Sequence, residues 1–298
     1  MGTLVGHIAP ALVLVMVGVW HLVSIFACYV KSPREYVARA WHPANWLPHR
    51  GKHVELYVLV LFIPVAIFYE LGVSTNFQPL VDGAIPKNRV SSFEHTTTLI
   101  MFWMYAVIVL VSDTTAALPL PSEASLLFAS IAFGLEWISV SNQAARNSGL
   151  ESQCNLLLAY VAALCAICTG LLALRPKLFL VDLVLCMGII LQGTWLFQIG
   201  LYLYVEKFIP EGCHYRLDLP TGIDGSTQCD IEVSRVRAVA LVNLAFNFHV
   251  IMVVLFSVLV FAAVAKVYGT RRGYDSLSRD ITDGEGVKPV PKLHIERP

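Results

Sequence analysis

The sequence is poor in charged residues. Only 14% of its 298 residues are Asp, Glu, Lys or Arg, whereas 56% are hydrophobic. A soluble domain has about 25% charged residues, because its surface must be hydrated. So little charge on a chain of this size excludes a soluble globular domain. The formal net charge is zero, so a nucleic-acid partner is not indicated either.

The apolar residues form long runs without the period-two alternation of transmembrane barrel strands. A hydrocarbon core of about 30 Å needs about 20 helical residues to span it. We therefore predict an all-α polytopic membrane protein whose partner is the lipid bilayer, with a seven-transmembrane-helix bundle in residues 1–270 and a disordered cytoplasmic tail in 271–298. The predicted helices are 8–30, 54–73, 94–115, 122–141, 153–174, 178–206 and 238–268.

No positively charged segment precedes the first apolar run. Lys31 and Arg34 follow it instead, which favours a retained first helix over a cleaved signal peptide. Cytoplasmic loops of membrane proteins carry an excess of Lys and Arg. Placing the N-terminus outside or in a lumen puts most of these residues on the cytoplasmic side. We therefore predict an outside or lumenal N-terminus and a cytoplasmic C-terminus.

Two of the seven cysteines lie outside the apolar runs, in one polar loop. With the predicted orientation, Cys213 and Cys229 face the side on which disulfides persist, and we predict a bond between them. The alternative is two free thiols in a flexible loop. Cys165 and Cys168 have a redox or zinc spacing, but inside an apolar helix they are more typical of packed small hydrophobic residues.

Polar side chains interrupt the apolar runs. A charged residue at the centre of a membrane-spanning helix costs about 2.5–3.5 kcal/mol on insertion scales, so such residues are the first candidates for function. Helix rise places one group of them in the outer half of the bundle. This predicted intramembrane polar site comprises His7, Glu70, His95, Glu136, Gln192, Gln198, Asn243, Asn247 and His249.

Several chemistries fit this group of residues. Histidine with carboxylate binds zinc, iron or copper, two histidines can hold a haem, and the same groups relay protons. The metal-ligand candidates are His95, Glu136 and His249. The alternative is that the polar groups hydrogen-bond one helix to another. This alternative is favoured for the Asn and Gln residues, whereas Glu136 favours function, because a lone carboxylate joins helices poorly.

The remaining histidines are more typical of structural or loop positions: His21, His42, His49, His53 and His214. No spacing such as His-Glu-x-x-His is present that would identify a reaction by itself. The sequence therefore assigns no catalytic residue. It leaves open whether a cofactor (zinc, iron or haem) is bound.

Several segments resemble the transmembrane protein 45 family, whose plant members are also called viral-response proteins. The most specific is LQGTWLFQIG at residues 191–200, accompanied by Glu94-His95-Thr96-Thr97, Glu136 and Phe248-His249. Residues 32–43 resemble the plant branch in particular. The resemblance implies a multi-pass endomembrane or plasma-membrane protein, and it implies no reaction, because the family has no settled activity.

The chain departs from the family pattern after Glu136. Relatives carry several histidines there, whereas residues 139–155 contain none, which argues against a metal centre. Three functions therefore stay open. The favoured one is a non-enzymatic protein that binds or conducts a small species or supports membrane trafficking. The others are a metal- or haem-binding oxidoreductase or hydrolase, and a scaffold that uses the basic loop 31–53 and the tail.

Overall fold

The computed structural model describes residues 4–44, 49–73, 75, 77–78, 80–81, 83–86, 89–147, 149–215 and 227–284. In this part of the chain, seven helices are long and apolar enough to cross a membrane, which confirms the predicted all-α seven-helix bundle. They are α1 (Leu4–Lys31), α2 (Val54–Phe68), α3 (Val90–Thr114), α4 (Ser122–Arg146), α5 (Gly149–Leu174), α6 (Phe179–Tyr204) and α7 (Glu232–Gly284).

Short elements connect these helices. The π-helical turn η3 (Tyr69–Val73) continues α2, so that this span ends where the sequence predicted. The other short elements are the 3-10 turns η1 (Pro33–Glu35), η2 (His49–His53) and η5 (Glu206–Phe208), and the strands β1 (Cys213–Tyr215) and β2 (Thr227–Cys229).

The largest differences from the predicted boundaries are at α4 and α7. α4 continues to Arg146 instead of ending near 141, and α7 begins at Glu232 and continues to Gly284. The tail predicted to be disordered from residue 271 is therefore helical up to Gly284, and residues 285–298 lie outside the described residues. The physical reason is that a helix nucleated in an apolar span extends by one hydrogen bond per residue, without a second nucleation cost.

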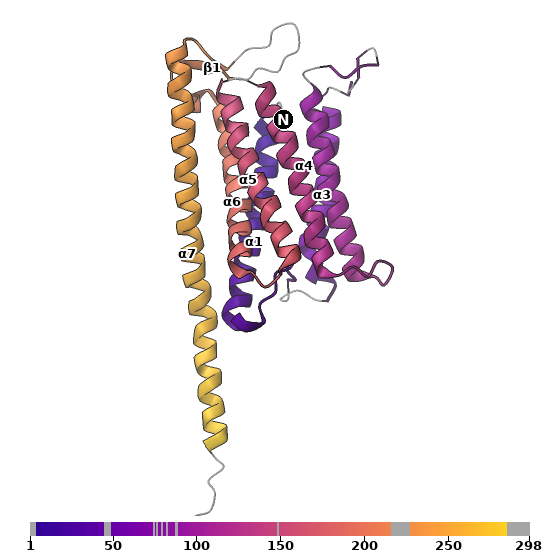
Figure 1. Ribbon diagram of the computed structural model, residues 1–298, viewed down its shortest axis with the longest axis vertical. Helices are drawn as coiled ribbons and strands as arrows, with labels where there is room; N and C mark the ends of the chain where they lie inside the picture. Colours follow the sequence, from indigo (N-terminus) through magenta and orange to yellow (C-terminus); the bar gives the residue numbers. More distant parts are fainter. Residues whose placement is uncertain are drawn as a thin grey trace, which may run out of the picture.

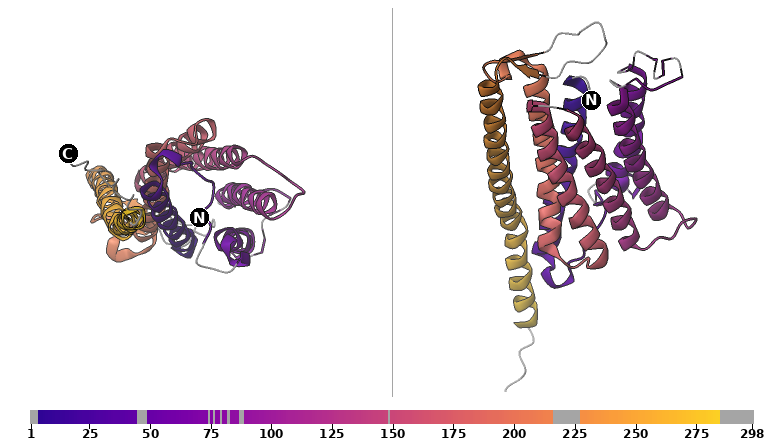
Figure 2. Two further views of the ribbon diagram at one scale, coloured as in Figure 1. Left: turned by 90° about the horizontal axis from the view of Figure 1, so that it is seen from below. Right: turned by 45° about the horizontal axis from the view of Figure 1, so that its top comes forward.

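The helices run along one common axis (Figure 1). α1 packs mainly on α6 and α4 mainly on α5, and α5 joins the two pairs through α6. α2 and α3 pack on each other, α3 packs on α4, and α2 contacts α1 through Glu55 and His21, whereas α7 lies at the edge of the bundle (Figure 2). α6 is the most buried span and α7 the least buried. Function is therefore best sought on the faces around α6.

Glycine allows α1 and α6 to approach closely. A Cβ atom on Gly193 would lie 2.8 Å from the carbonyl oxygen of Ala11, and one on Gly18 would lie 2.7 Å from Cγ1 of Ile190. Lipid tails are as apolar as leucine, so membrane helices associate by close packing, which small residues permit. These glycines hold Gln192, next to Gly193, in a fully buried position.

The two ends of the bundle differ in how they are closed. One end, here the hairpin end, carries the start of α1 and strands β1 and β2 (Figure 1). The other is closed by residues 36–44, here the strap, in which Tyr36, Ala38, His42 and Ala44 are buried. Hydrogen bonds fasten the strap to several helices: Tyr36 to Asp182 (2.5 Å), Tyr105 to Ala40 O (2.9 Å), Trp20 to His42 O (3.3 Å) and His42 N to Glu55 (3.1 Å).

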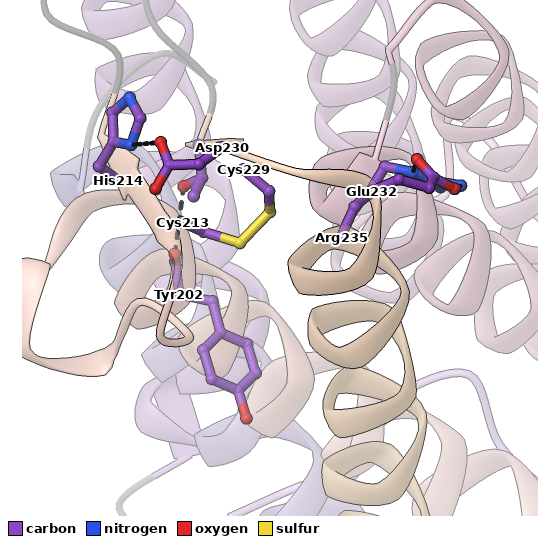
Figure 3. Close-up of a disulfide and its surroundings, with 8 residues drawn as sticks. Tyr202, Cys213, His214, Cys229, Asp230, Glu232 and Arg235 are labelled. Atoms are coloured by element: carbon purple, nitrogen blue, oxygen red, sulfur yellow. Dashed lines mark hydrogen bonds and ion pairs between the residues drawn. A yellow bond between two sulfur atoms is a disulfide. The ribbon is translucent and has the colours of Figure 1, made fainter.

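At the hairpin end, β1 and β2 pair antiparallel with Cys213 opposite Cys229. The two cysteines form a disulfide (Figure 3). Beside it, Nδ1 of His214 lies 3.2 Å from Oδ1 of Asp230. The bond closes a loop with a sequence separation of 16 residues, directly before α7 begins. It therefore ties the last span to the end of α6.

Replacing Cys213 with serine is expected to release this tie and leave the bundle folded, because the closed loop lies outside the spans. In a chain carrying an inserted protease site between residues 216 and 226, cleavage should give two fragments that stay joined on a non-reducing gel. The fragments should separate on reduction, and without reduction in the Cys213→Ser variant. Fragments that separate without reduction in the parent chain would contradict the disulfide.

Candidate functional site

A polar contact between two side chains joins α4 to α6 inside the bundle. Nε2 of Gln192 donates a hydrogen bond to Oε1 of Glu136, and the Gln192 side chain is 0% exposed. This contact uses one polar atom of each side chain. Oε2 of Glu136 and Oε1 of Gln192 are buried and have no hydrogen-bond partner among the described residues. Two acceptor oxygens are therefore left without a donor deep in the bundle.

The same face of α4 carries two further polar side chains. Ser139 and Gln143 follow Glu136 at spacings of three and seven residues, which places all three on one side of the helix. Both are buried, and neither Oγ of Ser139 nor Nε2 of Gln143 has a hydrogen-bond partner in the described structure. Sequence reasoning missed both residues, although their helical spacing from Glu136 was readable. We call Glu136, Ser139, Gln143 and Gln192 the polar site.

Polar groups continue from this site toward the hairpin end. The side chain of Gln143 is hydrogen-bonded to His95 of α3, and His7 of α1 lies close enough to interact electrostatically with His95. His7 is itself buried, with its ring centroid 5.2 Å from that of Tyr204. The structure therefore brings His7, His95, Glu136 and Gln192 of the predicted site into one continuous stripe.

An ion pair stands at the outer margin of this stripe. Nη1 of Arg146 donates to Oε1 of Glu94 over 2.8 Å, and Nη2 of the same guanidinium contacts Oε2. The pair joins the end of α4 to the start of α3. Arg146 follows Gln143 by three residues, and Glu94 directly precedes His95. Both side chains are partly exposed, so the screened pair contributes about 1 kcal/mol or less to stability. The pair matters because it holds α3 and α4 together next to the contact between Gln143 and His95.

The other predicted site residues lie elsewhere. Glu70 is buried in η3, and Gln198 is hydrogen-bonded to Tyr202 on its own helix. Asn243 accepts a hydrogen bond of 2.7 Å from Gln153, which joins α7 to α5 as a helix-bridging contact. Asn247 is on an exposed face of α7. These four positions do not extend the polar site.

His249 lies in different surroundings from Glu136. It is half-buried, with its ring 5.6 Å from that of Trp195 in an edge-on arrangement. It opens onto a recess of about 260 Å³ among α1, α6 and α7, which is lined by Ala11, Leu12, Val15, Thr194, Phe197 and His249. Because the other lining residues are almost all apolar, the recess is suited to a lipid chain more than to a polar solute.

The three metal-ligand candidates, His95, Glu136 and His249, therefore do not form one metal site in the described structure. Among the described residues, no group of three or more His, Cys, Asp or Glu side chains is placed to hold a metal ion. Glu136 is hydrogen-bonded to Gln192, whereas the ring of His249 lies against Trp195. The donor set of the polar site consists of oxygens, which is a poor set for zinc, haem iron or copper.

A second polar cluster, which sequence reasoning treated as structural, lies at the strap end. Nε2 of His21 lies 2.6 Å from Oε1 of Glu55, and the ring of His42 stands edge-on to His21 with centroids 4.9 Å apart. Nε2 of His42 is buried without a hydrogen-bond partner in the described residues. Burial, with His21 and Arg39 nearby, holds the pKa of His42 well below its ordinary value.

The strap end also holds a tyrosine–carboxyl pair. The hydroxyl of Tyr36 donates to Oδ2 of Asp182 over 2.5 Å. Burial first, and the Asp182 carboxyl second, raise the pKa of Tyr36. The tyrosine therefore stays protonated and keeps donating this bond. The residues of this cluster come from α1, the strap, α2 and α6, so no local sequence pattern would have grouped them.

The fold and the buried polar residues together define a multi-pass, all-α membrane protein. Within that class, the chain is similar to a protein family described as a family of unknown function (DUF716), whose sequence model matches residues 122–262. The matched segment runs from the start of α4 into α7. It contains all four residues of the polar site.

Proposed function

We propose that this protein binds a small polar species inside the membrane, at the polar site between α4 and α6. The main observation is that each of its four residues has a buried polar atom without a hydrogen-bond partner among the residues that the structure describes: Oε2 of Glu136, Oγ of Ser139, Nε2 of Gln143 and Oε1 of Gln192. A species bound beside Glu136 would supply the missing partners of the three oxygens, and Nε2 of Gln143 would line its approach. No covalent chemistry is needed for this function.

The energetic argument separates this proposal from simple helix joining. A buried polar atom without a partner costs about 1–3 kcal/mol. Helix joining accounts for the bond between Gln192 and Glu136, and it leaves the four other atoms unexplained. Several such atoms on one helix face add up to a free energy that a purely structural contact would not repay. A polar occupant removes that cost.

The stripe of polar groups supports access from the hairpin end. Gln143, His95 and His7 lead from the polar site to the end that carries the disulfide hairpin. Because disulfides persist in oxidising compartments, we propose that this end faces a lumen or the exterior, with the C-terminus cytoplasmic. This orientation also follows the distribution of Lys and Arg. The motif at 191–200 supports placing the chain near the transmembrane protein 45 family, in an endomembrane or the plasma membrane.

Cysteine labelling from water tests the proposed site. In Ser139→Cys, a small water-soluble methanethiosulfonate reagent should react with the new thiol, because the polar stripe admits water. Ile138 is the matched control, since it is the preceding residue of α4 and its side chain is 50% exposed on the lipid-facing surface. In Ile138→Cys the thiol faces hydrocarbon. The first thiol should react faster on the order of tenfold, because thiolate forms only where water reaches.

Labelling is measured on the protein in vesicles and corrected for the parent chain, whose five free cysteines in the described structure are unchanged in both variants. Added reagent should reach Ser139→Cys only from the compartment that the hairpin end faces. Equal, slow labelling of both variants would show a dry site and remove the basis of the proposed function.

A further inference from the structure

The charge of the polar site is not balanced by any side chain described here. The ion pairs of the described structure involve other carboxylates, namely Glu55, Asp113, Glu94, Asp230, Glu232 and Glu211. Glu136 forms a hydrogen bond with Gln192 and no ion pair with another described residue. A carboxylate in hydrocarbon without a cation costs several kcal/mol. The site therefore needs one positive charge.

The atoms around Glu136 are suited to receive that charge. Oε2 of Glu136, Oε1 of Gln192 and Oγ of Ser139 are all buried oxygens without a hydrogen-bond partner in the described part of the chain. Gln192 and Ser139 are themselves 0% and 8% exposed. Carboxylate, carbonyl and hydroxyl oxygens are the ligands that hard cations take in proteins. The same oxygens accept hydrogen bonds from a cation that carries protons.

The number of charges limits the class of cation. One carboxylate neutralises one positive charge, and a divalent ion would leave a net charge inside the bundle. An anion would be repelled by the carboxylate. A neutral solute would fill the oxygens' bonds and leave the charge of an ionised Glu136 uncompensated. A singly charged cation, of which a proton on Glu136 is the smallest, satisfies both the oxygens and the charge.

We propose that the occupant of the polar site is a single monovalent cation held by Glu136, Gln192 and Ser139. The cation is a proton on Glu136, an alkali ion or an ammonium ion. This inference rests on the proposed function and narrows it to one class of ligand. Gln143, about 10 Å from Glu136 along the helix axis, belongs to the approach and lies too far away to share the ion.

Thermal unfolding of the purified protein in lipid vesicles tests the inference. A ligand that binds only the folded state raises the unfolding midpoint Tm with its concentration. Tm is measured in sodium, potassium, ammonium or choline chloride at equal ionic strength and pH 8. One of the three smaller cations should raise Tm on the order of 5 °C above choline. A proton as occupant should instead raise Tm of the parent relative to that of Glu136→Gln, in choline, as the pH falls from 8 to 5.

The response must depend on the site. Glu136→Gln keeps the shape and removes the charge, so it should lose the cation response or the proton response, whichever the parent shows. Ser139→Ala removes one oxygen and is the second variant if Glu136→Gln does not fold. It should weaken the dependence of Tm on an alkali or ammonium ion several-fold. Glu123→Gln is the matched control, because Glu123 is exposed at the start of the same helix, and it should respond like the parent.

The two proposals fail differently. If Tm of the parent and of Glu136→Gln shifts identically with every cation and with pH, the occupant is not a monovalent cation. Labelling of Ser139→Cys from water would then still support a polar site with a different ligand. If that labelling is absent, the proposed function itself is wrong.

Discussion

Replacing Gly193 with leucine is expected to separate α1 from α6 and to remove most of the folded protein. A Cβ at this position would lie 2.8 Å from the carbonyl oxygen of Ala11 and 2.9 Å from the backbone nitrogen of Val15. Backbone atoms cannot move aside as a flexible side chain can, so the whole of α1 must shift. Such overpacking costs roughly 1–3 kcal/mol or more, and the bundle loses its most extensive pairing with α6.

Gly134→Leu is the control for this substitution. Gly134 also lies inside a membrane-spanning helix, α4, and a Cβ there meets no atom within 4 Å. The two variants share the change in composition and differ only in the space available. The yield of monodisperse protein in detergent and its Tm should fall for Gly193→Leu and stay close to the parent for Gly134→Leu. Similar behaviour of both variants would contradict the close packing of α1 on α6.

Acidification is expected to release the strap at the other end of the bundle. His42 is buried there, and burial holds its pKa well below its ordinary value. A histidine whose pKa is lower in the folded state stabilises that state above the unfolded pKa, about 6.5. This contribution is lost as the pH falls below that value, because the buried ring must then become charged. The closed strap should therefore be stable at pH 7.5 and weakened at pH 5.5.

The groups around His42 favour its neutral form and hence the lowered pKa. His21 of α1 and Arg39 of the strap both oppose a positive charge on the ring. Glu55 of α2 is already bonded to Nε2 of His21 and to the backbone nitrogen of His42, so its two oxygens are engaged. Asp182 of α6 is bonded to Tyr36. No carboxylate among these partners is left to stabilise a protonated His42.

Two neighbouring strap positions provide the measurement. Ala38 is 1% exposed and Val37 is 41% exposed. A cysteine at position 38 is therefore labelled only when the strap opens, and one at position 37 is labelled in either state. Dividing the labelling rate at position 38 by that at position 37 cancels the pH dependence of the thiol itself. This ratio should rise on the order of tenfold from pH 7.5 to pH 5.5, because pH 5.5 lies about one unit below the ordinary histidine pKa of 6.5, at which the exposed ring takes up a proton. In a His42→Gln background, which keeps a neutral polar side chain, the ratio should stay flat; a rise there would assign the release to another group.

The spans could be predicted from the sequence because each is a local property. The runs around Leu22 and Leu158 are long enough and apolar enough to cross a bilayer whatever their neighbours do. The prediction of the C-terminal segment was less good, since the polar residues after 270 were judged by composition alone. They follow directly on an existing helix, and that context carries α7 to Gly284.

The candidate site was predictable in part. Glu136 and Gln192 stood out as polar groups in apolar runs, and the structure joins them directly. His249 stood out for the same reason and lies against Trp195 instead. Ser139 was overlooked because serine is common in membrane helices. It is marked by its buried hydroxyl, which has no hydrogen-bond partner within the described ranges.

The sequence by itself determined the class of this protein, because hydrocarbon admits a backbone only when its polar groups are bonded within the segment, and the apolar runs are long enough for that as helices. Tertiary structure decided which polar groups meet. His21, His42 and Glu55 form one cluster although their spacing predicts nothing, since contacts between helices depend on which faces pack. The faces are set by close approaches such as that of Gly193 to α1, a property of two helices together.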